Sequence, residues 1–178
     1  MGSNNQFNTQ ADSGKKESSI NSTQKITPCL WFDSNAEEAV NFYVSIFKNS
    51  KINSVNYYGV DGPLKAGTVL TITFELDGTE FTALNGGPHF KFSEAISFVV
   101  NCDTQEEIDM FWDKLSENGE IQMCGWLKDR YGLSWQIVPG FLEEMLKGDD
   151  QEKTDKVMKA ILQMKKLDIG ILKSAYEE

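Results

Sequence analysis

The chain has 178 residues, 40% of them hydrophobic, and its 27 acidic and 17 basic side chains give a formal net charge of −10. This length and apolar content fit one compact domain or two small fused halves, and the acidic balance argues against nucleic acid as a partner, because phosphate binding needs basic patches. Three cysteines without paired spacing argue against a zinc site or a disulfide scaffold, so we expect reduced thiols and a cytoplasmic protein. The sequence contains no apolar run of about 18 residues that could span a membrane.

The first half of the chain predicts a strand, a helix and three more strands. Residues 1–25 are polar and lack the apolar core of a signal peptide, so we predict a disordered tail there. Asn35 is the candidate N-cap of the helix, with Glu38 three residues later as in a capping box. Asp77-Gly78 predicts the two-residue turn of a hairpin. The expected strands cover residues 26–32, 51–58, 68–76 and 79–84, and a linker follows at residues 85–92.

The second half of the chain repeats this pattern. The helix sequence EEAVNFY, which begins at Glu37, returns as EEIDMFW at Glu106, 69 residues later, and Thr104 with Glu107 forms a second capping box. Neither half can cover its own apolar face, so the repeat predicts two paired modules, at residues 26–92 and 93–139, with C-terminal helices at residues 140–178. The later strands are expected at residues 94–101, 121–125, 126–129 and 133–139, and the helices at residues 141–147, 151–167 and 168–176.

Side chains alternate between the two faces of each predicted strand, which separates an apolar face from a mixed one. The Asp77-Gly78 turn pairs Phe74 with Phe81 on the face that should take the helix, and it pairs Glu75 with Glu80 on the mixed face. These two acids are interpreted as solvated side chains beside an exposed turn, with a carboxylate pair that shares a proton or binds a cation as the alternative. The mixed faces of the two halves are expected to line a cup. The tryptophans expected in the core are Trp31, Trp112 and Trp135.

Four motifs narrow this interpretation: TPCLWFD at Thr27, NAEEA at Asn35 with Phe42-Tyr43 after it, LNGGP at Leu84, and CGWLKDRYGLSWQ at Cys124. Together they resemble the vicinal oxygen chelate superfamily of glyoxalase I, bleomycin-resistance proteins and extradiol dioxygenases. Within it they resemble the PhnB-like branch described as the 3-demethylubiquinone-9 3-methyltransferase domain, over about residues 25–178. The resemblance implies an α+β fold of two βαβββ modules, whose curved mixed sheets pair around a cup, and it implies a homodimer.

The resemblance also implies where a metal would be held. Metal-dependent members carry His, Glu or Gln ligands on the first and last strands of each module, and the matching positions here are Pro28, Thr82, Ser97 and Gln136. Proline has no ligand atom in its side chain, and the hydroxyls of Thr and Ser are poor ligands for zinc, iron or nickel. The sole histidine, His89, lies in the linker. We therefore expect no cofactor, and a divalent metal is disfavoured.

These observations favour a protein that binds an unidentified small molecule, as the drug-sequestering members of the superfamily do. One alternative is a metal-dependent isomerase or lyase that uses Glu75, Glu80 and Gln136 with residues of a subunit partner, and others are the methyltransferase named in the family description and a non-catalytic structural dimer. Asn85-Gly86-Gly87-Pro88 reads as a turn and not as the fingerprint of a nucleotide-type cofactor site. The residues expected to bind the ligand are Leu30, Phe32, Thr82, Ser97, Trp126, Ser134 and Gln136.

Overall fold

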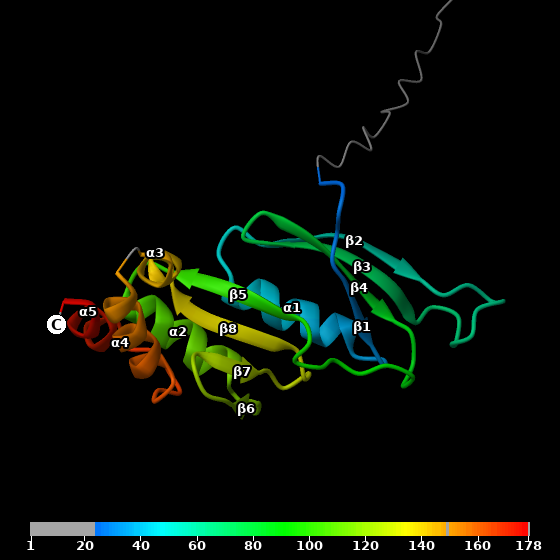
Figure 1. Ribbon diagram of the computed structural model, residues 1–178. Helices are drawn as coiled ribbons and strands as arrows, with labels where there is room; N and C mark the ends of the chain where they lie inside the picture. Colours follow the sequence, from blue (N-terminus) through cyan, green and yellow to red (C-terminus); the bar gives the residue numbers. More distant parts are fainter. Residues whose placement is uncertain (1–23, 149, 178) are drawn as a thin grey trace, which may run out of the picture.

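Two βαβββ modules follow each other along the chain and are succeeded by three helices (Figure 1). The computed structural model describes residues 24–148 and 150–177, so the tail predicted at residues 1–25 lies almost wholly outside the described residues. The first module consists of β1 (Cys29–Phe32), α1 (Ala36–Ile46), β2 (Lys51–Tyr57), β3 (Val69–Leu76) and β4 (Thr79–Asn85). The second consists of β5 (Ser97–Cys102), α2 (Gln105–Leu115), β6 (Glu120–Ile121), β7 (Trp126–Lys128) and β8 (Ser134–Pro139).

Each module forms its own four-stranded mixed sheet. The first sheet has the order β1-β4-β3-β2 and the second the order β5-β8-β7-β6. In both sheets the first strand is parallel to the last one and the other neighbours are antiparallel. The predicted α+β fold of two such modules with C-terminal helices is confirmed.

The hairpin register predicted from the Asp77-Gly78 turn is also confirmed. Phe74 lies opposite Phe81, and Glu75 lies opposite Glu80. The two phenylalanine rings stack with their centroids 5.5 Å apart on the buried face of the first sheet. A two-residue turn leaves the strands only one way to pair, so alternation then fixes the face of every side chain.

The two modules share one hydrophobic core, which α1 joins together. Tyr43 of α1 is fully buried and its ring lies 5.6 Å from that of Trp135 on β8, while Phe81 of the first sheet contacts Phe98 of the second at 5.2 Å. The aromatic faces of both sheets therefore turn toward this shared core. The opposite, mixed faces point away from this core. The sequence had led us to expect that they face each other across a cup, and within one chain they do not.

These mixed faces are called the open faces from here on. The open face of the first sheet carries Cys29, Trp31, Thr71, Thr73, Glu75, Glu80, Thr82 and Leu84. The open face of the second sheet carries Ser97, Val99, Asn101, Trp126, Lys128, Ser134 and Gln136.

The two module helices begin in different ways. Thr104 caps α2 as predicted, since its hydroxyl accepts the backbone N–H of Glu107, whose carboxylate accepts the N–H of Asp103. The predicted cap of α1 is wrong, because the side chain of Asn35 makes no capping hydrogen bond. Its place is taken by Asn85 of β4, whose Oδ1 accepts the N–H of Ala36, 49 positions earlier in the chain, at 2.9 Å.

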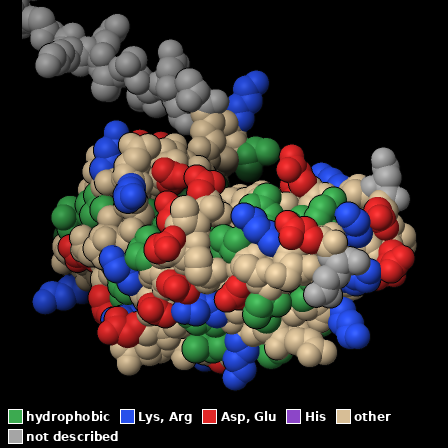
Figure 2. Space-filling model, turned by 90° about the vertical axis from the view of Figure 1, so that its left-hand side faces the viewer, with side chains coloured by type: hydrophobic (Ala, Val, Ile, Leu, Met, Phe, Trp, Pro, Cys, Tyr) green, Lys and Arg blue, Asp and Glu red, His purple; other side chains and the backbone are tan. Residues whose placement is uncertain are grey.

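The C-terminal helices α3 (Leu142–Lys147), α4 (Gln151–Ile161) and α5 (Ile169–Glu177) pack at one end of the second sheet around a smaller apolar cluster that includes Val138, Val157 and Leu172. On this end of the molecule acidic and basic side chains are interspersed (Figure 2). The helix predicted over residues 151–167 ends earlier, at Ile161, where the N–H groups of Gln163 and Met164 bond to carbonyls three residues back. The carbonyls of Met164 and Lys165 then accept the N–H groups of residues 124 and 125. Among the described residues, no helix has the length and apolar character needed to cross a bilayer.

Candidate functional site

The open face of the second sheet brings together four of the residues predicted to bind a ligand. The amide Nε2 of Gln136 donates to the hydroxyl of Ser97 at 2.8 Å, and both side chains are half-buried. Trp126 lies opposite Gln136 on β7, and Ser134 lies opposite Ser97 on β5. The Ser134 hydroxyl is fully buried and has no hydrogen-bond partner within the described part of the chain. Hydroxyl, amide and indole groups thus occupy one face.

The open face of the first sheet carries Thr82, the fifth predicted residue. Thr82 lies beside Cys29 on β1 and opposite Thr73 on β3. The next pair along β1 and β4 is Trp31 with Leu84, so an indole ring also belongs to this face. Trp31 is half-buried, its Nε1 donates to the carbonyl of Gly87 at 2.9 Å, and the Phe90 ring meets it edge-on at 4.9 Å.

The placement of Trp31 corrects the prediction that it packs in the core. Trp112 and Trp135 do lie there, with 4% and 3% of their surface exposed. The signal that separates them was present in the sequence, because Trp31 alternates with the core residues Leu30 and Phe32 on a short strand.

Leu30 and Phe32 lie on the core side of β1 and not on the open face. They are 5% and 3% exposed and form part of the core shared by the two modules. A ligand on the open face would be separated from them by the sheet itself, so the group of candidate ligand-binding residues does not include them.

Glu75 and Glu80 each have a partner of their own on the open face. Glu75 lies 3.5 Å from the ammonium of Lys51 and accepts a hydrogen bond from Asn53 at 2.9 Å. Glu80 accepts from the hydroxyl of Thr27 at 3.5 Å. These contacts favour the interpretation of two separately paired surface acids over a carboxylate pair that holds a cation.

Strand pairing shows that Pro28 is not equivalent to Ser97. Thr82 and Gln136 are the matching positions of the last strands. Cys29 lies beside Thr82 on the first strand of its module, and Val99 lies beside Gln136 in the same way, so matching positions of the two first strands are 70 residues apart. The helices repeat after 69 residues. The difference arises because three residues connect β1 to α1 and two connect β5 to α2. Ser97 therefore corresponds to Thr27, and Pro28 shares the core side of its strand with Leu30, which corrects the position assigned from the sequence.

A family model described as 3-demethylubiquinone-9 3-methyltransferase matches residues 24–138, which contain both open faces. The chain belongs to this family. It is thereby a member of the vicinal oxygen chelate superfamily, as the sequence motifs predicted. The match ends before α3, so the resemblance expected for the C-terminal helices is not part of it.

The chain is also similar to solved structures, of which the first supports the family assignment. The PhnB protein from Bacillus cereus, which carries the same methyltransferase description, is 44% identical over 65% of this chain and 99% of its own, with a TM-score of 0.61. The protein PA1353 from Pseudomonas aeruginosa is 22% identical over 64% of this chain and 96% of its own, with a TM-score of 0.54. The fosfomycin resistance protein FosX from Listeria monocytogenes is 18% identical over 71% of this chain and 98% of its own, with a TM-score of 0.49. No curated protein matches the chain.

The side chains at the superfamily's metal positions do not fit a transition metal in this family member. After the register correction these positions are Thr27, Thr82, Ser97 and Gln136, and none of them offers imidazole, thiolate or carboxylate. Cys29 lies beside Thr82, but it is a single exposed thiol, and a structural or catalytic metal site needs three or four such ligands. Among the described residues no three His, Cys, Asp or Glu side chains are placed to hold an ion together.

The LNGGP motif of the family has a structural role here. Asn85 is 2% exposed and connects α1 to β3, because its amide also donates to the carbonyl of Val69 at 3.0 Å. A Cβ atom on Gly86 would lie 2.2 Å from the ring of Trp31, so glycine is needed for the indole to pack this close to the backbone. This motif therefore positions Trp31 and caps α1.

Asp129 joins the two modules and was not identified from the sequence. It is 3% exposed, and its carboxylate accepts from the Tyr43 hydroxyl at 2.7 Å and from Trp135 Nε1 at 2.9 Å. The backbone N–H groups of residues 131 and 133 donate to its other oxygen. Burial raises its pKa, although the four donors oppose that shift. A single acid in a polar motif gives no sequence signal of burial, and its Tyr43 donor comes from a helix 86 residues away in the chain.

Proposed function

We propose that the protein binds a small molecule, without a catalytic metal, between the open face of the first sheet in one copy and the open face of the second sheet in another. The Ser97–Gln136 hydrogen bond carries this proposal, because it holds an amide and a hydroxyl at the superfamily's metal positions, beside the Trp126 indole. Thr82 and Trp31 offer the same chemistry on the first sheet. A few placed polar groups beside aromatic rings are typical of small-molecule sites.

A second copy is required by this proposal because the two open faces of one chain point away from their shared core. Several apolar side chains near these faces are exposed in the single chain, among them Phe90 at 65% and Val99 at 51%. Contact with a partner would cover such side chains and would enclose the polar groups between two sheets. The three cysteines are free thiols, which suits a reducing compartment, so we also propose a cytoplasmic location.

The proposal is tested by native mass spectrometry of the purified protein and of its Gln136→Leu variant, with a trace-metal analysis of both. We expect the wild-type protein to retain a small organic mass that the variant loses, because leucine keeps the volume but removes the amide. Ser54→Ala, at an exposed position of β2, is the matched control and should retain the mass.

Each alternative function predicts a different result in the same experiment. One transition metal ion per chain would contradict the metal-free site and would favour an isomerase or lyase. A methylated mass formed only when a methyl donor is added would favour the methyltransferase named in the family description. No bound mass in any preparation would favour a structural dimer.

A further inference from the structure

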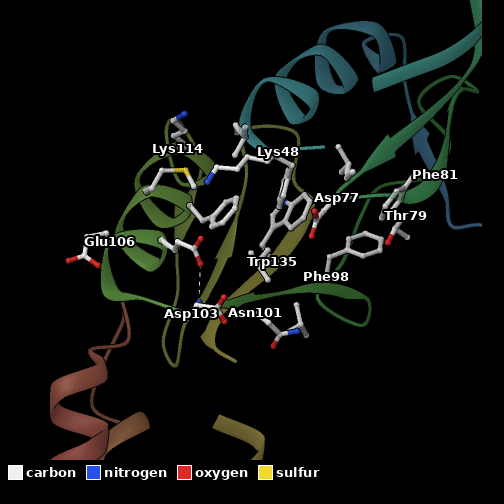
Figure 3. A pocket seen from close by; sticks show the side chains of 18 residues that line it. Lys48, Asp77, Thr79, Phe81, Phe98, Asn101, Asp103, Glu106, Lys114 and Trp135 are labelled. Carbon is white, nitrogen blue, oxygen red and sulfur yellow. Dashed lines mark hydrogen bonds between the residues drawn. The ribbon is translucent and has the colours of Figure 1, made fainter. Parts of the chain in front are cut away.

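A groove of about 880 Å³ lies between the two modules, and its floor is the outer edge of the core side chains that join them. It is bordered by the end of α1 and the β3–β4 turn on one side, and by β5 and α2 on the other (Figure 3). The volume falls within the range of about 300–1,000 Å³ that is common for ligand pockets. Groups from both modules line it, so it exists only because the modules pack together.

The floor of the groove is a continuous aromatic surface. Phe98 contacts Trp135 at 5.6 Å and Phe81 at 5.2 Å, while Phe47 lies 5.5 Å from Trp135 in a stacked arrangement and 5.0 Å from Phe111. Phe98 and Phe111 are only half-buried, so their rings are accessible from the groove. Such a surface offers stacking and edge contacts to a flat ring system.

The charged groups that line the groove are mainly acidic. They are the carboxylates of Asp77, Asp103, Glu106 and Glu107 and the ammonium groups of Lys48 and Lys114, which gives four negative charges against two positive ones. In Figure 3 the Trp135 ring system lies between Asp77 and Asp103. Within the described residues, neither of these two carboxylates accepts a hydrogen bond or joins an ion pair of the chain, so both are available to a ligand. Glu107 is used at the start of α2, where it accepts from the N–H of Asp103.

We propose that this groove binds a planar aromatic cation, with its rings against the accessible Phe98 and Phe111 and its positive charge near Asp77 and Asp103. Aromatic faces attract cations, and the carboxylates add a charge of the complementary sign. An anion of the same shape is disfavoured by the excess of acids in the groove. The groove shares Val99 and Asn101 of β5 with the open face of the second sheet, but neither Ser97 nor Gln136 lines it, so either proposal can fail without the other.

The test compares the binding of 9-aminoacridine, a planar cation near neutral pH, with that of acridine-9-carboxylate, a planar anion of similar size, by fluorescence titration. We expect saturable binding of the cation and much weaker binding of the anion. Equal binding of the two probes would overturn the proposal. Absence of binding would overturn it as well, including the case in which a second copy covers the groove.

Single charge changes then locate the site. Asp77→Asn and Asp103→Asn should each weaken binding of the cation about two- to fivefold, and Lys48→Gln should strengthen it by a similar factor, because partly solvated charge pairs have effects of this size. Asparagine is well tolerated at the first turn position, where φ is 47°. Asp61→Asn removes the same charge from an exposed loop outside the groove and should change nothing. If Asp61→Asn weakens binding as much as the groove variants do, the attraction is general to this acidic protein and the proposal is wrong.

Discussion

The Asp129 carboxylate shows how one residue can hold the two modules in place. A buried charge is costly unless donors surround it, and the donors here come from α1, from β8 and from the turn before β8. Since the Tyr43 hydroxyl reaches it from the other module, the pair acts as a polar contact inside an aromatic core. Burial also raises the pKa of Tyr43 well above its usual value, so this hydroxyl remains a donor over the whole working range of pH.

Tyr43→Phe is predicted to destabilise the protein in a pH-dependent way. An acid whose pKa is raised on folding stabilises the folded state less as pH rises from about 4, the usual value for Asp, through its raised value. The Tyr43 bond favours the ionised form, so it offsets part of that loss. We therefore expect the variant to lose about 1.5–3 kcal/mol of unfolding free energy near neutral pH and less at low pH, where the carboxyl is protonated in both states.

Urea unfolding of both proteins over a series of pH values measures this difference. A gap between the two curves that stays constant with pH would show that the hydroxyl acts only through packing, and would contradict the role given to the carboxylate. Because phenylalanine keeps the ring of Tyr43 in the core, the comparison isolates the hydrogen bond.

Residue positions on the strands were predictable wherever alternation alone decided them. Thr82, Ser97 and Gln136 lie on the open faces as expected, since a hairpin register or a strand period places them. Pro28 was misplaced because its position was counted through the β–α connection, whose length differs between the modules by one residue. A shift of one residue moves a side chain to the opposite face of a sheet.

At the scale of elements, the start of α1 shows what local sequence rules miss. Asn35 has the residue type and position of an N-cap, yet its side chain makes no such bond, and Asn85 takes this role from a neighbouring strand. The same limit applies to the end of α4, where apolar periodicity continues beyond Ile161 but the chain leaves the helix, and the carbonyls that follow pair with the loop at residues 124–125. Both outcomes depend on chain segments that meet only after folding.

Asn85→Ala is therefore predicted to lower the free energy of unfolding by about 2–4 kcal/mol, because it leaves the buried N–H of Ala36 and the carbonyl of Val69 without partners. Asn35→Ala is the matched control and should change it by less than about 0.5 kcal/mol, as expected for an exposed side chain. Chemical denaturation of the two variants compares them directly. A larger loss of unfolding free energy in Asn35→Ala than in Asn85→Ala would show that Asn35 caps α1, as predicted from the sequence.

At the scale of the whole molecule, the repeat predicted the architecture but not the direction of its faces. Each module has one aromatic face, and a duplicated sequence does not determine whether two such faces meet around a shared core or cover separate helices. The structure has the first arrangement, with α1 between the sheets. The cup expected from the sequence can then form only between chains, which would give the proposed dimer a functional reason beyond the stability of its subunits.

The last prediction concerns this dimer. Sedimentation at micromolar concentration should give a mass near twice the 20.1 kDa of the chain. Val99 is 51% exposed on the open face of the second sheet, and Val99→Asp should weaken association about tenfold or more, because a carboxylate would be buried there without a partner. Val60→Asp, at an 88% exposed site in the β2–β3 connection, should leave association unchanged. If the wild-type protein sediments as a monomer, the proposed site between two chains does not form. If Val99→Asp leaves the dimer unchanged, the interface does not include the open face of the second sheet.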